Sequence, residues 1–124
     1  MITEDYVSFE TAKLLKDKGF PQGTFRCHYI IDGNSHYKSF ENRCGFGDYD
    51  IIAPTLQIAM KWLREVHNIY IEITPSSKTN EFIVDSYRID IVTKTFDTIY
   101  VSSGYDTYEQ ACEAAIKYCL ENLI

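Results

Sequence analysis

The sequence contains no apolar run of the roughly 20 residues that a membrane-spanning helix needs. Its opening segment, Met1 to Asp5, ends in two acids, whereas a secretory signal peptide begins with basic residues followed by an apolar stretch. We therefore expect a cytoplasmic protein that does not engage a membrane. In that compartment the four cysteines are expected to remain thiols and not to form disulfides.

Proline and glycine are also scarce, with three and six residues among 124. They do not gather with serine into a linker, and the chain has no low-complexity stretch. A chain of this length fits one domain. We therefore predict a single α+β domain over residues 1–124.

Basic residues are few in the second half of the chain. Residues 63–124 hold five Lys and Arg against ten Asp and Glu, residues 1–62 hold seven against eight, and the formal net charge is −6. An acidic half argues against binding a phosphate backbone through bulk electrostatics. We therefore do not expect a nucleic acid partner, although these numbers leave room for a small basic patch.

Motifs for catalysis are missing as well. There is no G-x-S-x-G, and Gly45-Phe46-Gly47 does not lead into the strand, turn and helix of a phosphate-binding loop. Asp48 and Asp50 lack the further oxygen ligands of a calcium loop, so we interpret them as turn residues. Because no nucleophile, base and orienting group can be assigned together, we predict that the protein is not an enzyme and has no cofactor.

The clustered metal-type ligands are Cys27, His28, His36 and Cys44. They lack the close pairs of a structural zinc site, such as C-x-x-C or H-x-x-x-H. Cys27 and His28 are adjacent, so on a strand they face opposite sides. We expect a buried Cys27 beside surface histidines, without a metal.

What the sequence does contain is a helix start that occurs twice. Ser8 to Ala12 and Thr107 to Ala111 each combine a hydroxyl N-cap, an aromatic residue and an acid near the positive end of the helix dipole. These signals predict helices from Phe9 to Lys18 and from Tyr108 to Leu123.

The stripe of the last helix carries two thiols, Cys112 and Cys119. A thiol buried on such a stripe packs as a small apolar group, so we interpret both as core residues and not as nucleophiles. A further helix is predicted from Pro54-Thr55 to His67.

Five segments have the composition or alternation of strands. They are residues 25–32, 36–40, 69–74, 82–93 and 98–102. Residues 41–53 are expected to form a loop, and Gly104 is expected to end the last strand. The resulting order, α-β-β-α-β-β-β-α, predicts an α+β fold in which the C-terminal helix packs on an antiparallel sheet.

The predicted middle helix carries Ile58 and Trp62 beside its inner stripe. We expect both to be buried between two layers, and the alternative is an exposed anchor for a partner. In that alternative Lys61 and Glu65 are available to pair across a two-fold contact. These four residues are the candidate partner surface.

The segment Phe82 to Val92 has the composition of an edge strand, with Asp85, Arg88 and Asp90 as edge charges that discourage pairing with another chain. A net charge of −6 also opposes self-association. We favour a monomer over a homodimer.

The stretch Ala53 to Ile69 resembles a segment of small uncharacterised α+β proteins of gut anaerobic bacteria and of their phages and mobile elements, and Ile2 to Ala12 and Thr107 to Ala111 are similar to the same group. The resemblance implies a compact cytosolic protein and brings no known activity, cofactor or catalytic residue. From residue 55 onward the predicted order is also that of double-stranded RNA-binding domains, but Glu109 occurs where those domains have a basic cluster.

Our leading hypothesis is a small non-enzymatic module that binds or regulates an unidentified protein partner through an aromatic-rich, acidic surface. The alternative is an antitoxin-like or nucleic-acid-associated regulator, because HicB-type antitoxins likewise end a small sheet with a helix. That alternative requires a basic patch, for which the candidates are Lys13, Lys16, Lys18, Arg26, Lys38 and Arg43.

Overall fold

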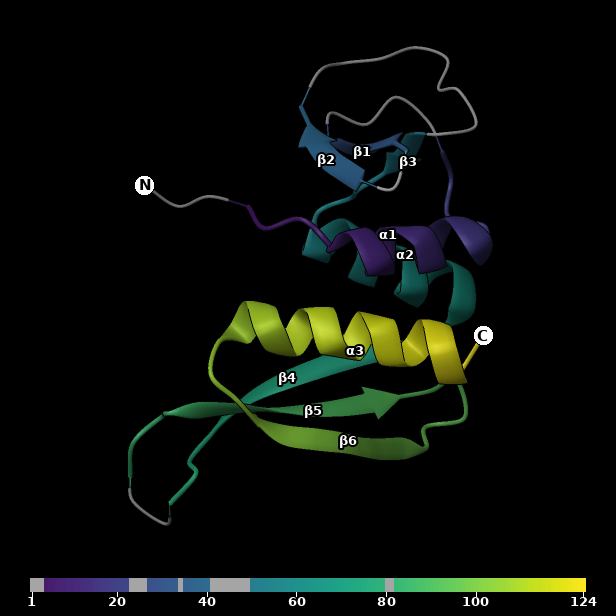
Figure 1. The fold of residues 1–124 in the computed structure, drawn as a ribbon. Coiled ribbons are helices and arrows are strands. Elements are labelled where there is room, and N and C mark those ends of the chain that lie inside the picture. The colour runs from purple at the N-terminus through teal and green to yellow at the C-terminus, as the bar shows by residue number, and fades with distance from the viewer. Residues whose placement is uncertain (1–3, 23–26, 34, 41–49, 80–81) are drawn as a thin grey trace.

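The computed structural model describes residues 4–22, 27–33, 35–40, 50–79 and 82–124. Within these ranges the helices are α1 (Phe9–Asp17), α2 (Leu56–His67) and α3 (Tyr108–Asn122). The strands are β1 (His28–Asp32), β2 (Ser35–Ser39), β3 (Asp50–Ile52), β4 (Tyr70–Ser76), β5 (Ser86–Val92) and β6 (Thr98–Tyr105). Figure 1 shows a layered arrangement: one sheet, then α1 and α2, then α3, then a second sheet.

The helices begin where the hydroxyl caps predict. The backbone N–H of Thr11 donates to the Ser8 hydroxyl over 3.3 Å, and that of Gln110 donates to the Thr107 hydroxyl over 3.1 Å. Helix α2 starts in the same way at Thr55. The predicted helices are confirmed, with ends that differ from the prediction by one or two residues at most.

The N-terminal sheet has the strand order β2-β1-β3, with antiparallel pairs on both sides of β1. Its third strand lies within residues 41–53, so the predicted loop is wrong for Asp50–Ile52. A strand this short shows no periodic pattern. It forms because Ile51 and Ile52 are buried in the core while the backbone pairs with β1.

The C-terminal sheet has the strand order β4-β5-β6, again antiparallel. Strand β5 pairs on both sides, so the prediction of an edge strand at Phe82 to Val92 is wrong, and Arg88 and Asp90 are not edge charges. Alternation identifies a strand's two faces but not its neighbours, which the tertiary pairing decides.

Gly104 does not end the last strand as predicted. It lies inside β6 with φ +92°, next to a shift in the pairing register between β5 and β6. A glycine can take this left-handed conformation without a Cβ clash, so the strand bulges and continues to Tyr105.

Helix α3 packs on the inner face of the C-terminal sheet and also contacts α1 and α2 (Figure 1). Its buried side chains are Ala111, Cys112, Ala115, Ile116, Cys119 and Leu120. They meet Ile89 and Ile91 in one core. The predicted α+β class and the packing of the last helix on the sheet are confirmed. No helix among the described residues is both long and apolar enough to cross a membrane.

Candidate functional site

The predicted metal-type cluster is only partly described. Cys27 is buried as expected, but His28 is fully buried too, so the prediction of surface histidines is wrong for this residue. His28 lies in the central strand of its sheet, and its side chain is fully buried there. His36 is exposed and stacks on Phe9 with 3.8 Å between ring centroids. Cys44 lies outside the described residues.

Elsewhere in the described ranges, no three His, Cys, Asp or Glu residues gather as metal ligands would. Cys27, Cys112 and Cys119 are free thiols in the core. Burial raises the pKa of Cys112 to about 11 and that of Cys119 to about 12. A nucleophilic cysteine needs a lowered thiol pKa, so neither environment activates the sulfur.

The predicted partner surface on α2 is not one apolar face. Trp62 is half-buried against the core and meets Phe20 edge-to-face at 5.4 Å, whereas Ile58 is 41% exposed. Lys61 and Glu65 lie 3.9 Å apart within the same helix. The tryptophan and the isoleucine therefore point to different surroundings, and the charged pair is satisfied locally.

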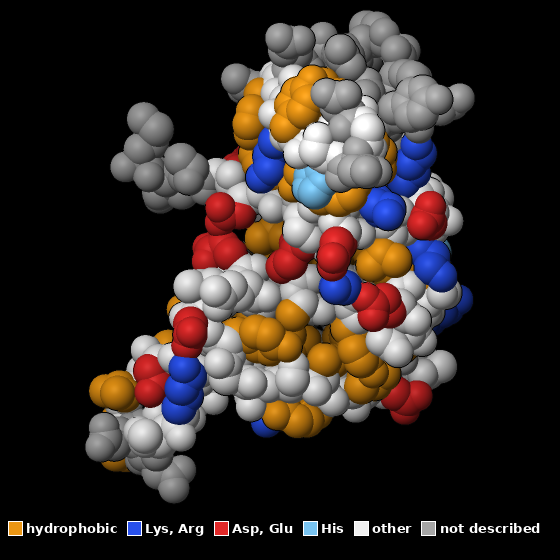
Figure 2. Space-filling view, in the orientation of Figure 1, with side chains coloured by type: hydrophobic (Ala, Val, Ile, Leu, Met, Phe, Trp, Pro, Cys, Tyr) orange, Lys and Arg blue, Asp and Glu red, His pale blue; other side chains and the backbone are white. Residues whose placement is uncertain are grey.

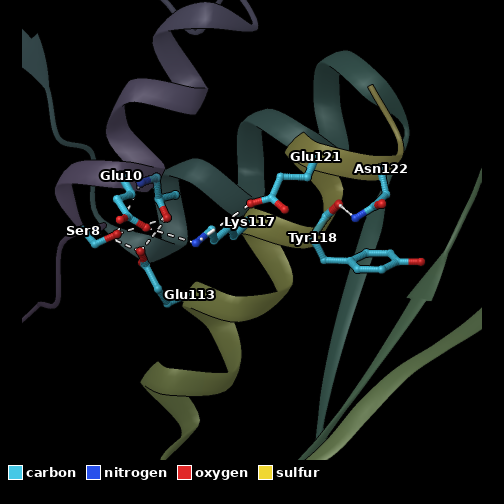
Figure 3. A network of polar contacts seen from close by, with 8 residues as sticks. Ser8, Glu10, Glu113, Lys117, Tyr118, Glu121 and Asn122 are labelled. Atoms are coloured by element: carbon cyan, nitrogen blue, oxygen red, sulfur yellow. Dashed lines mark hydrogen bonds and ion pairs between the residues drawn. The ribbon is translucent and has the colours of Figure 1, made fainter.

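A polar network joins the start of α1 to α3 (Figure 3). Glu113 Oε1 accepts hydrogen bonds from the Thr11 hydroxyl at 2.6 Å and from the Ser8 backbone N–H at 3.0 Å. Lys117 lies 3.1 Å from Glu10 and 3.9 Å from Glu121. Figure 2 shows this boundary as charged side chains of both signs beside hydrophobic ones. These contacts hold α1 against α3, two helices that are distant in sequence.

An open cleft of about 650 Å³ adjoins this network, between β2 and the starts of α1 and α3. Its aromatic residues pack on one another: Phe9 stacks on His36 and meets Tyr29 edge-to-face at 5.4 Å. The Tyr29 hydroxyl donates to the Val7 carbonyl over 2.9 Å. Burial, with the charges of Cys27 and Glu113, raises the pKa of Tyr29 to about 12. The rings that line this cleft therefore pack against one another, and the Tyr29 hydroxyl already has a hydrogen-bond partner. We interpret these contacts as structural.

The C-terminal sheet has a second face, opposite α3, against which no described element packs (Figure 1). We call it the outer face. Strand alternation and the pairing register place eight side chains on it, namely Tyr70, Glu72, Thr74, Arg88, Asp90, Val92, Thr98 and Tyr100. Tyr70 and Tyr100 are 46% and 54% exposed. The sheet thus presents aromatic rings among charges.

A guanidinium site is already formed on the outer face. Arg88 donates to both carboxylate oxygens of Asp90, over 2.8 and 3.0 Å, and its guanidinium carbon lies 4.6 Å from the centroid of the Tyr100 ring. The bond to Asp90 raises the pKa of Arg88. Stacking on an aromatic ring together with a bidentate carboxylate is the geometry that arginine favours.

A smaller cleft of about 320 Å³ opens at the end of the outer face where α2 finishes. We call it the Phe96 cleft. It is lined by Asn68, Tyr70, Glu72, Val92, Thr93, Lys94 and Phe96.

Phe96 lies in the turn between β5 and β6, is 89% exposed, and has φ +62°. The turn is closed by bonds from the Phe96 N–H to the Thr93 carbonyl and from the Thr93 N–H to the Asp97 carbonyl. In a three-residue hairpin loop of this kind the left-handed position is normally taken by glycine. A phenylalanine there combines an unfavourable backbone conformation with an exposed ring.

The outer face was not identified as a site by sequence reasoning. Alternation along residues 69–74 did place Tyr70 and Glu72 on one side of a strand, which is part of the signal. The neighbours supplied by the other strands and the φ of Phe96 depend on strand order and turn geometry. Local periodicity predicts neither the strand order nor the turn geometry.

Comparison of the chain with protein-family models, curated proteins and solved structures finds no match. The resemblance of its helical segments to small proteins of gut anaerobic bacteria therefore stays a prediction.

Proposed function

We propose that this chain is a small non-enzymatic, protein-binding or regulatory module of the cytoplasm, and that it binds its partner through the outer face. The observation that supports this most is the set of exposed aromatic rings, with Tyr70 and Tyr100 on the outer face and Phe96 in the turn at its end. Aromatic side chains supply much of the binding energy of protein interfaces, because they bury a large area at little cost in conformational entropy.

The charges of this face agree with a protein partner. Glu72 and Asp90 stand beside the rings, and Arg88 is bound to Asp90. A face that mixes acids, an arginine and tyrosines has the composition of an interface rim and core, whereas a phosphate backbone requires an excess of basic side chains. Free thiols at Cys27, Cys112 and Cys119 agree with a reducing compartment.

Three of the basic residues considered for the nucleic-acid alternative, Lys13, Lys18 and Lys38, have contacts within the chain, and the Lys18 ammonium donates to the Ile124 carbonyl over 3.0 Å. Lys13 lies over the Phe9 ring at 5.6 Å and Lys38 over the Tyr29 ring at 5.7 Å. Arg26 and Arg43 lie outside the described residues. We therefore treat nucleic acid binding as the alternative, which the experiment below distinguishes from protein binding.

The test is affinity purification from the native cell, with the wild-type chain and a triple variant, Tyr70→Ser, Phe96→Asn and Tyr100→Ser, as baits. We expect a specific partner with the wild type that the triple variant does not retain. The matched control is Tyr37→Ser, Phe40→Ser, which removes two rings at the N-terminal sheet that are about as exposed as Tyr70 and Tyr100, and it should retain the partner.

Equal recovery of the partner by the triple variant would contradict the proposal. A salt-dependent gel shift with DNA or RNA, in the absence of any protein partner, would instead support the antitoxin-like or nucleic-acid-associated regulator.

A further inference from the structure

The outer face holds one complete guanidinium site and half of a second. In the complete site, the ring of Tyr100 and the carboxylate of Asp90 hold Arg88. In the half-site, Tyr70 and Glu72 lie two residues apart on β4 and therefore on the same side of the strand. Glu72 has no hydrogen-bond or ion-pair partner within the described ranges. The ring of Tyr70 and the carboxylate of Glu72 therefore lack the cation that Arg88 supplies in the first site.

The position of Glu72 adds an electrostatic reason to expect a cation at the half-site. It stands directly opposite Asp90 in the antiparallel pair of β4 and β5. Like charges at directly opposed positions destabilise a sheet. Arg88 neutralises Asp90, and nothing described neutralises Glu72. A cation bound at Glu72 would relieve this repulsion.

Phe96 supplies the second wall of the half-site. It lines the same cleft of about 320 Å³ as Tyr70 and Glu72. Its ring is held there by a backbone with φ +62°, which glycine or asparagine would adopt more easily. Unfavourable backbone conformations persist most often at functional sites, and this one sets an exposed aromatic ring at the mouth of the cleft.

We infer that the Phe96 cleft receives an arginine side chain of the partner protein, with the guanidinium against the rings of Tyr70 and Phe96 and its N–H groups donating to Glu72. The inference rests on the proposed function and names the chemistry of the partner. Arginine fits better than lysine because its planar group stacks on rings and donates to both carboxylate oxygens. The cleft volume suits one long side chain and not a whole helix.

The basic side chain of Lys94 also lines the Phe96 cleft. It forms no ion pair with Glu72 in the part of the chain that the structure describes, so it does not fill the half-site. Its charge opposes an incoming guanidinium. Replacing Lys94 by Met should therefore strengthen binding of an arginine ligand, by about threefold at low salt.

The test is a titration of the full-length, isotope-labelled chain with N-acetyl-arginine amide, followed by NMR. We expect saturable shifts confined to the Phe96 cleft, including the amides of Tyr70, Glu72 and Phe96. N-acetyl-citrulline amide has nearly the same shape without the charge, and we expect it to bind at least about tenfold more weakly. N-acetyl-lysine amide should fall between the two.

Two variants give the matched comparison. Glu72→Gln should weaken arginine binding about tenfold, because it removes the carboxylate and keeps the shape. Glu65→Gln removes the same charge from the exposed surface of α2 and should leave the binding unchanged. Phe96→Leu should weaken binding about threefold, since it removes the ring and keeps an apolar side chain.

Shifts that do not saturate, equal binding of citrulline, or equal effects of the two Gln variants would overturn the inference. These results are distinguishable from a failure of the proposed function. If the native partner depends on the outer face while the arginine ligand does not bind, the proposed function stands and the arginine inference falls. If no partner depends on that face, the proposed function falls as well.

Discussion

At the scale of single residues, Phe96 is the position where local energetics and the observed structure disagree most. Its φ of +62° is unfavourable for any side chain with a Cβ, except that asparagine and aspartate tolerate it. Its ring is 89% exposed, so little packing compensates within the described chain. A residue whose backbone conformation costs stability and whose side chain packs little within the described chain is placed as expected for a binding role.

The first prediction follows from this conflict. Phe96→Asn should raise the free energy of unfolding in urea by about 1 kcal/mol, because asparagine accepts the left-handed conformation. Phe82→Asn is the control, since Phe82 is fully exposed and its φ is not positive, and its effect should stay within about 0.5 kcal/mol. An unchanged or lowered stability for Phe96→Asn would show that the turn is not strained. The same variant should bind the arginine ligand more weakly.

The second prediction concerns three buried acids of the core. Their pKa values are raised, from 9.0 to about 11 for Cys112, from 9.0 to about 12 for Cys119 and from 10.0 to about 12 for Tyr29. Because the unfolded chain releases these protons at a lower pH than the folded chain, stability is fully present below pH 9.0 and is lost as pH rises toward 12.

Urea unfolding at intervals between about pH 8 and pH 11, with a reductant present, measures this loss. In Cys119→Ala the fall in stability across that interval should be smaller than in the wild type, because one of the three groups no longer titrates. A stability that rises with pH above 9.0 would contradict the assignment of these groups to the core.

At the scale of elements, the contact between α1 and α3 depends on one carboxylate. Glu113 accepts from the hydroxyl of Thr11, which is fully buried, and from the backbone N–H of Ser8 at the start of α1. Ser8 and Thr11 were assigned to the start of α1 from the sequence alone. Their partner on α3, about a hundred residues away in the chain, was not.

The third prediction tests this contact. Glu113→Ala should lower the free energy of unfolding by about 2 kcal/mol, since it leaves the buried Thr11 hydroxyl without its acceptor. Glu121→Ala is the control, because Glu121 is exposed and only reaches Lys117 at 3.9 Å, and its effect should be below about 0.5 kcal/mol. Thr11→Val combined with Glu113→Ala should be less harmful than the sum of the two, as expected for direct partners. Simple additivity would exclude a specific bond.

At the scale of the whole molecule, most of the exposed large apolar side chains lie on the C-terminal sheet and its hairpins, whereas α2 exposes Ile58 and Val66. Trp62 packs inward, and Lys61 and Glu65 pair within the helix. Together with a net charge of −6, which opposes self-association, this packing leads us to expect a monomer.

The fourth prediction is therefore a monomer by light scattering at micromolar and at sub-millimolar concentration. A dimer that dissociates in Ile58→Ala would contradict it and place the contact on α2, because Ile58 is the exposed apolar residue of the predicted surface. A dimer that dissociates in Phe96→Asn and not in Ile58→Ala would place the contact on the outer face.

The sequence by itself determined the helices, most strands and the α+β class. Hydroxyl caps at Ser8, Thr55 and Thr107 and the stripe of α3 are local signals, because a helix satisfies its hydrogen bonds and sorts its faces within a few residues.

Only the tertiary structure decided which strands neighbour one another and therefore where the candidate site lies. Strand β3 and the central position of β5 depend on backbone partners that are distant along the chain, and a strand leaves those partners open. The outer face needs three strands in register, and the Phe96 cleft needs a turn conformation that its residue disfavours. Pairing and turn geometry are set by the packing of the whole core, which no local pattern encodes.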